Sequence, residues 1–167
     1  MDEKPQVQPA GRAEWRAWLA ENHQTSPGVW LVTWKKQAAR PTVAYKEAVE
    51  EALCFGWIDG VFGRVDEERS KQWFAPRRPK STWARTNKER VGRLEIAGLL
   101  TETGRRAIEI AQANGSWNSL DAIDGLVVPD DLAAALTARP GSRERFDASS
   151  ASVRRSALAW VYQAKRP

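Results

Sequence analysis

The hydrophobic positions in the first half of the chain follow two different periods. Near the N-terminus, Trp15, Trp18 and Leu19 recur at helical spacing, which predicts one face of a short helix. Residues 29–34 form a β-branched and aromatic run that is too short for a typical helix, so they predict a strand. Helical spacing returns at 45–53, with acidic residues on the other side, and predicts a second helix.

A β-hairpin is expected after this second helix. Two strand-like runs, 57–65 and 70–75, flank an acidic turn, and we expect them to pair antiparallel beside the 29–34 strand. From Thr86 onward the spacing is helical, beginning with a Thr-x-x-Glu capping box at 86–89. The sequence therefore predicts an α+β fold, in which a small antiparallel β-sheet is packed by helices and followed by a helical C-terminal part.

The 167 residues have the length of one domain. Within it we expect a disordered N-terminal tail at 1–11, an α+β core at 12–117, and a helical part at 118–167 that packs on the core. The tail is polar and contains proline, which favours disorder at a terminus.

Tryptophan is unusually frequent, with nine residues against two Tyr and four Phe. Large aromatic side chains are mostly buried, so these residues are expected chiefly in the core. We predict core positions for four of them, which lie on an apolar face or in a strand-like run: Trp15, Trp18, Trp57 and Trp160.

Charge and cysteine content narrow the possible functions. The formal net charge of +5 favours acidic partners such as nucleic acid, anionic lipid or an acidic protein surface. One Cys and one His give neither an internal disulfide nor a transition-metal site, and we expect no metal and no cofactor. Because no run of about 18 apolar residues and no apolar signal core is present, we expect a cytoplasmic protein without membrane insertion.

Catalytic motifs are absent: there is no nucleophile elbow, no phosphate-binding loop and no His-Glu-x-x-His helix. Two weaker arrangements stay open. Cys54 with His23 would make an activated thiolate, but Cys54 also fits a buried hydrophobe and His23 a helix end. Asp59 has apolar and aromatic neighbours, which suits acid–base work, although it would equally stabilise a turn or pair with a buried Arg.

The segment 77–93 is strongly basic, with seven Lys or Arg residues against the single acid Glu89. Trp73, Phe74 and Trp83 accompany it, so it combines phosphate-neutralising and base-stacking side chains. The forked guanidinium groups of its arginines would also bind a carboxylate- or phosphate-bearing ligand. The third possibility is that the segment is simply a solvated helix face.

Arg77 and Arg78 follow a predicted strand end, where a short loop would point them out of the sheet. We expect one of the two to pair with an internal acid such as Asp59 and the other to meet an external anion, with Trp83 packing close by.

The chain also resembles a known family. The block Tyr45-Lys46-Glu47-Ala48-Val49-Glu50-Glu51-Ala52-Leu53-Cys54-Phe55-Gly56-Trp57-Ile58-Asp59-Gly60, followed by Phe74-Ala75-Pro76-Arg77-Arg78, is similar to the YdeI/OmpD-associated family, and the similarity extends over nearly everything after Gly11. Ala84 departs from the family's usual Ser, and Leu100 from its common Met. The resemblance implies protection against bacteriocins or cationic peptides and an indirect association with an outer-membrane porin.

The sequence thus predicts a stress or resistance protein that acts by binding an anionic small molecule or an acidic protein surface, rather than an enzyme. The candidate ligand-binding residues are Trp57, Asp59, Arg77, Arg78, Ser81, Trp83 and Asn87. Two alternatives remain: a nucleic-acid-binding protein that uses the basic 77–93 face, and a small-molecule enzyme with Asp59 as acid or base.

Overall fold

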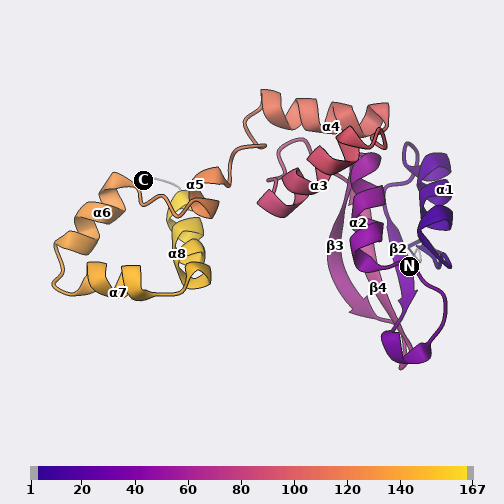
Figure 1. Cartoon of the computed structure of the whole chain (residues 1–167), viewed down its shortest axis with the longest axis horizontal. Coiled ribbons are helices and arrows are strands. Elements are labelled where there is room, and N and C mark those ends of the chain that lie inside the picture. Colours follow the sequence, from indigo (N-terminus) through magenta and orange to yellow (C-terminus); the bar gives the residue numbers. More distant parts are fainter. Residues whose placement is uncertain (1–3, 165–167) are drawn as a thin grey trace.

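The computed structural model describes residues 4–164 and has an α+β fold, in which helices pack onto a four-stranded sheet (Figure 1). The strands are β1 (Gln6–Val7), β2 (Val29–Trp34), β3 (Trp57–Arg64) and β4 (Arg69–Pro76). The helices are α1 (Arg12–Asn22), α2 (Tyr45–Cys54), α3 (Arg85–Ile96), α4 (Glu102–Ala113), α5 (Asp121–Asp124), α6 (Asp130–Thr137), α7 (Ser142–Ala148) and α8 (Ala151–Gln163), with a 3-10 turn, η1, at Lys36–Ala38.

The sheet has the order β1-β2-β4-β3. As predicted, β3 and β4 form an antiparallel hairpin, and β4 also pairs antiparallel with β2. The expected antiparallel sheet gains a parallel edge strand, because β1 pairs parallel with β2 and makes the sheet mixed. The strand β1 lies within the tail that was expected to be disordered. It pairs there because the open edge of β2 offers unpaired backbone groups, and the Trp30 amide donates to the Pro5 carbonyl at 2.9 Å. Residues 1–3 of that tail lie outside the described residues.

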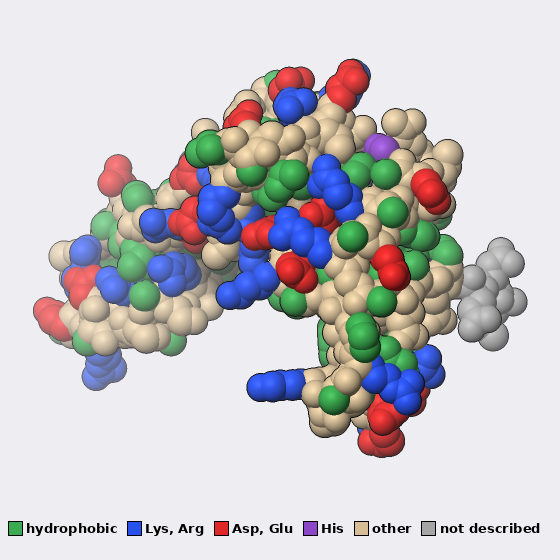
Figure 2. Space-filling model, turned by 45° about the vertical axis from the view of Figure 1, so that its right-hand side comes forward, with side chains coloured by type: hydrophobic (Ala, Val, Ile, Leu, Met, Phe, Trp, Pro, Cys, Tyr) green, Lys and Arg blue, Asp and Glu red, His purple; other side chains and the backbone are tan. Residues whose placement is uncertain are grey.

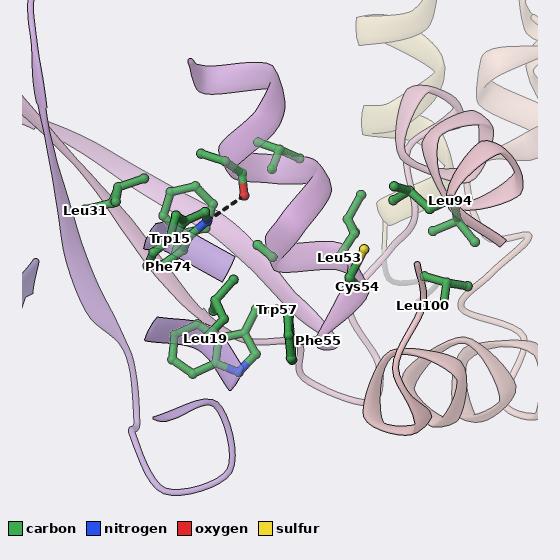
Figure 3. Close-up of a cluster of buried hydrophobic side chains, with 14 of the residues drawn as sticks. Trp15, Leu19, Leu31, Leu53, Cys54, Phe55, Trp57, Phe74, Leu94 and Leu100 are labelled. Atoms are coloured by element: carbon green, nitrogen blue, oxygen red, sulfur yellow. Dashed lines mark hydrogen bonds between the residues drawn. The ribbon is translucent and has the colours of Figure 1, made fainter. Parts of the chain in front are cut away.

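The core lies between the sheet and the helices α1 and α2 (Figure 3). Trp15 of α1 is fully buried, packs against Phe74 of β4 at 5.3 Å between ring centroids, and donates its indole N–H to the Ala48 carbonyl. A buried indole needs such a partner, so this bond fixes α1 against α2. We call the side of the sheet that carries Phe74 the inner face.

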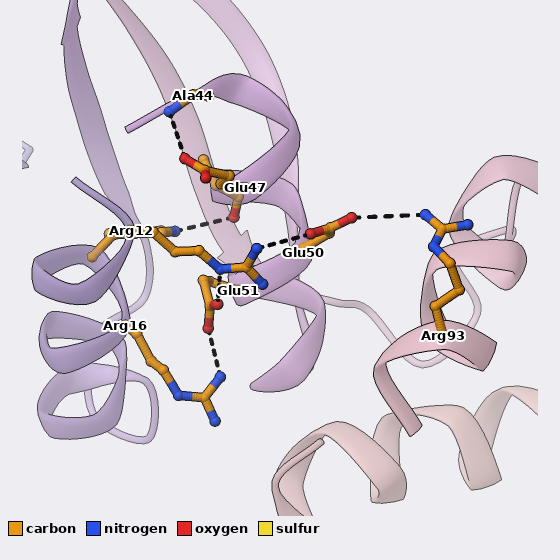
Figure 4. Close-up of polar contacts among 9 residues, drawn as sticks. Arg12, Arg16, Ala44, Glu47, Glu50, Glu51 and Arg93 are labelled. Atoms are coloured by element: carbon orange, nitrogen blue, oxygen red, sulfur yellow. Dashed lines mark hydrogen bonds and ion pairs between the residues drawn. The ribbon is translucent and has the colours of Figure 1, made fainter. Parts of the chain in front are cut away.

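Ion pairs also join α1 and α2 (Figure 4). Glu51, whose exposed fraction is 2%, accepts from Arg12 and Arg16 of α1 at 2.6 Å each. The neighbouring Glu50 lies 3.2 Å from Arg12 and 3.7 Å from Arg93 of α3. The carboxylates of α2 therefore connect α1 to α3.

Helix α4 docks closely on the C-terminal end of α2. A Cβ atom at Gly104 would lie 2.3 Å from the Cys54 carbonyl oxygen, so only glycine allows this approach. Thr101 caps α4 through the Gly104 amide and also donates its hydroxyl to the Cys54 carbonyl at 2.7 Å. This docking places α4 beside the end of the β3–β4 hairpin.

The four Trp residues assigned to the core have different outcomes. Trp15 and Trp57 are buried, and the partly buried Trp18 packs between them, stacked on Trp15 and edge-on to Trp57. The prediction is wrong for Trp160, which is 79% exposed. Helix α8 buries Leu158 instead. Trp160 lies two positions further along, and residues two positions apart in an α-helix point to nearly opposite sides.

The C-terminal helices α5–α8 form a group beside α3 (Figure 1). Lys88 of α3 forms an ion pair with Asp121, and the rings of Trp83 and Trp117 lie 4.9 Å apart. The predicted capping box does not form, because α3 begins at Arg85 with Ala84 as its N-cap and Glu89 pairs with Arg85 at 3.0 Å. In the part of the chain that the structure describes, no helix is both long and apolar enough to cross a membrane.

Candidate functional site

A pocket of about 170 Å³ opens where the β3–β4 hairpin ends against α4. The strand end Trp57, the loop after β4 and one side of α4 form its walls. Twelve residues line it: Phe55, Gly56, Trp57, Pro76, Arg77, Arg78, Pro79, Trp83, Thr103, Arg106, Ala107 and Ile110. We call it the arginine pocket, because these twelve described residues supply three guanidinium groups and no carboxylate.

Arg77 is the most constrained of the three arginines. Its guanidinium lies over the Trp83 ring, 3.7 Å from the centroid, and Nη2 donates to the Thr82 carbonyl at 2.7 Å. Its Nε is buried and has no hydrogen-bond partner among residues 4–164. Burial lowers the Arg77 pKa to about 10, against a smaller opposing effect of the Asp59 charge. The guanidinium nevertheless stays charged at neutral pH, because a pKa near 10 lies well above 7.

The expected internal pair between an arginine and Asp59 is not formed. Within residues 4–164, no carboxylate lies within ion-pair distance of Arg77 or Arg78. Asp59 instead accepts a hydrogen bond from the Tyr45 hydroxyl at 2.8 Å. Burial, and to a smaller extent this hydrogen bond, raises the pKa of Tyr45. The reason is strand geometry: Asp59 lies opposite Phe74 in the register, further along the hairpin than Trp57.

The loop that carries Arg77 and Arg78 is held by its neighbours. The Pro79 carbonyl accepts from the Asn114 side chain at 2.7 Å and from the Ser116 hydroxyl at 3.2 Å. Ser81 closes the loop by donating both its amide and its hydroxyl to the Arg78 carbonyl. The loop backbone is therefore held in place before any ligand arrives, which reduces the entropy lost on binding.

The structure brings together four of the seven predicted site residues, Trp57, Arg77, Arg78 and Trp83. Ser81 supports the loop, and Asn87 accepts from Arg90 at 2.6 Å outside the pocket lining. Arg106 was missed by the sequence interpretation, because it reaches the pocket from α4 and no local pattern marks it.

The basic segment 77–93 does not form one stacking surface. Phe74 and Trp83 are buried, with exposed fractions of 0% and 2%. Arg85, Lys88 and Arg93 each pair with an acid. Figure 2 shows Lys and Arg side chains interspersed with Asp and Glu on the face in view. These observations give no support to nucleic-acid binding by this segment.

A second pocket of about 480 Å³ lies between the inner face of the sheet and the start of α2. Its lining is mainly apolar and includes Leu31, Val43, Phe62 and Phe74. Among the described residues that line it, Lys36 alone is charged. Tyr45, the partner of Asp59, also lines this pocket. Asp59 therefore belongs to the surroundings of the second pocket rather than to the arginine pocket.

Cys54 and His23 do not form a catalytic pair in this arrangement. His23 contacts the Leu19 carbonyl at 2.8 Å and the Thr103 hydroxyl at 3.1 Å. Cys54 is fully buried, and burial raises its thiol pKa. Among the described residues, no group of three or more His, Cys, Asp or Glu side chains is arranged to hold a metal ion.

We therefore expect Cys54 to be unreactive in the folded protein, because both burial and a raised pKa lower the amount of accessible thiolate. Alkylation by iodoacetamide at neutral pH, followed by mass spectrometry, should be much slower for native protein than for urea-unfolded protein. Equal rates for the two forms would contradict this assignment.

Comparison with known proteins separates the chain into two matched regions. Residues 7–107, more than half of the chain, match the model of the family described as domain of unknown function DUF8412. Residues 125–167 match the model described as bacteriocin-protection, YdeI or OmpD-associated. The resemblance to that second family, expected over nearly the whole chain, is thus found for residues 125–167. No curated protein and no solved structure matches the chain. The chain belongs to the DUF8412 family, and its C-terminal region is similar to YdeI or OmpD-associated bacteriocin-protection proteins.

Proposed function

We propose that the protein binds a small organic anion in the arginine pocket. One observation carries this proposal: the guanidinium of Arg77 is largely buried against Trp83 and has no acidic partner among residues 4–164. An unpaired buried charge is costly, and an anion that enters the pocket would compensate it. Arg78 and Arg106 add positive charge at the same place.

The size and lining of the pocket restrict the ligand. A cavity of about 150 Å³ accommodates benzene, so this pocket of about 170 Å³ suits a body of similar size. Phe55, Pro76, Ala107 and Ile110 would contact the apolar body, while the guanidinium groups would bind a carboxylate or phosphate. A small aromatic or short aliphatic carboxylate or phosphate ester fits both requirements.

Binding is favoured over catalysis by the composition of the lining. Its twelve residues include no Asp, Glu, His or Cys, so the pocket offers no general base and no thiol nucleophile. The match of residues 125–167 supports a role in protection against bacteriocins, with the bound anion as the recognised molecule. We place this activity in the cytoplasm, and we regard any porin association as indirect.

A thermal-shift screen tests the proposal with phenyl phosphate and benzoate as probes and benzyl alcohol as the neutral control. A ligand at about 100 times its Kd stabilises by about 2.7 kcal/mol, which raises Tm by about 5–10 °C for a chain of this size. Only the two anions should give this shift. If no anion in the panel raises Tm, the proposal is wrong.

A pair of adjacent arginines supplies matched variants. Both Arg105 and Arg106 are exposed residues of α4, but only Arg106 lines the pocket. Arg106→Ala should weaken binding of phenyl phosphate about 10- to 150-fold, the effect of losing a charge-assisted hydrogen bond. Arg105→Ala should leave Kd nearly unchanged. Equal weakening by both would indicate unspecific attraction to a basic surface.

A further inference from the structure

The side of the sheet opposite the inner face carries tryptophan side chains together with basic ones. The antiparallel register of β2 and β4 sets Trp30 opposite Trp73 and Trp34 opposite Arg69, with Lys71 between these two pairs. Phe74, which α1 covers through Trp15, points to the inner face, so its strand neighbours point to the other side. We call this surface the tryptophan face and define it by Trp30, Trp34, Trp73, Arg69 and Lys71.

Glycines under one ring fix its position on the tryptophan face. A Cβ atom at Gly28 would lie 2.3 Å from the Trp73 ring, and one at Gly60 would lie 3.3 Å from it. Part of the indole surface therefore lies against the bare backbone of these two glycines. Trp30 meets Trp73 at 5.3 Å between ring centroids with an interplanar angle of 69°. The two rings form a pre-positioned, partly exposed aromatic pair.

Basic groups are interleaved with these rings. The ammonium group of Lys71 lies 4.6 Å from the Trp30 ring centroid, and that of Lys4 lies 4.8 Å from Trp73. Arg40 lies 4.5 Å over Trp34. Among the described residues, Lys4, Lys71 and Arg40 form no ion pair with an acid, whereas Arg69 is paired with Asp66 at 2.6 Å.

We propose that the tryptophan face binds single-stranded nucleic acid. Aromatic rings on an open sheet stack with unpaired bases, and neighbouring Lys and Arg side chains neutralise phosphates. Here each ring of the Trp30–Trp73 pair has a cation within 5 Å, so one nucleotide can present its base to a ring and its phosphate to the adjacent ammonium group. A duplex hides its base faces, and an acidic polypeptide or anionic membrane gives the rings no base to stack on. The site differs in place and ligand from the arginine pocket, so neither proposal depends on the other.

Fluorescence anisotropy with a labelled oligothymidylate of about 15 nucleotides tests the proposal, because this length exceeds most single-strand site sizes. Trp30→Leu should weaken binding about 5- to 150-fold, the range for one lost base–aromatic contact, while Trp30→Phe should retain most of the affinity. Lys71→Gln should reduce the slope of log affinity against log salt by about 0.7, the value for one phosphate contact on a single strand. Circular dichroism verifies that each variant is folded.

Matched controls identify the surface. Arg85→Gln removes a charge from the basic 77–93 segment and should leave oligonucleotide binding nearly unchanged. A loss of binding in Arg85→Gln but not in Lys71→Gln would move the site to the segment and overturn the proposal. It would also be overturned if the oligonucleotide fails to bind, if a duplex or polyglutamate binds as tightly, or if Trp30→Leu binds like the wild type.

Discussion

Replacing Trp15 by alanine is expected to lower the free energy of unfolding by about 3–5 kcal/mol, the range for removing a large buried aromatic. Trp15 is 0% exposed, contacts the rings of Trp18 and Phe74, and donates to the Ala48 carbonyl. The variant would lose these contacts, leave a cavity at the centre of the core and leave a buried carbonyl without its indole donor. Each of these changes acts in the same direction.

Trp160→Ala is the matched control, because the same side chain is removed where it is 79% exposed. Its effect should stay below about 0.5 kcal/mol, as for most surface substitutions. Urea unfolding followed by far-UV circular dichroism measures both values with one protocol. Similar losses for the two variants would contradict the burial assigned to either residue.

Removing both Arg12 and Arg16 is expected to destabilise the protein by about 3–5 kcal/mol, because the carboxylate of Glu51 would stay buried without a cationic partner. Glu51 has a side-chain exposure of 3%, while the two arginine side chains are 36% and 34% exposed. Water can therefore solvate the arginines after Glu51 is removed, but it cannot reach Glu51 after the arginines are removed.

This asymmetry gives an internal comparison. Glu51→Gln should cost only about 1–3 kcal/mol, because a neutral amide carries no buried charge and still accepts hydrogen bonds. Arg143→Ala, which breaks the exposed pair with Asp147, should change the unfolding free energy by less than about 1 kcal/mol. A double Arg variant that is as stable as Arg143→Ala would show that Glu51 is solvated.

Local patterns account for the parts of the fold that the sequence predicts. The run 29–34 coincides with β2 and the spacing at 45–53 with α2, because each pattern is set by neighbours within the element. The strand β1 could not be predicted from a local pattern, because two residues are too few to show a period. Their pairing depends instead on the open edge of β2. Trp160 misled the interpretation because an apolar side chain on a helix does not reveal whether another element covers it.

The same distinction applies to the candidate site. Trp57, Arg77 and Arg78 meet because a hairpin brings its two ends together, and a predicted hairpin is enough to expect this. Arg106 joins them through the docking of α4 at Gly104, a tertiary contact that no local spacing encodes. The partner of Asp59 depends on where Tyr45 begins α2, which again is a tertiary relation.

The most direct test of anion binding in the arginine pocket is an NMR titration of ¹⁵N-labelled protein with phenyl phosphate. Binding in the arginine pocket should give the largest shifts at the Arg77 side-chain Nε–H, the Trp83 indole N–H, and the backbone amides of Gly56 and Arg106. These shifts should saturate together. Shifts that are absent, or that are largest at residues outside the pocket such as those around Lys36 or Trp30, would contradict binding in this pocket.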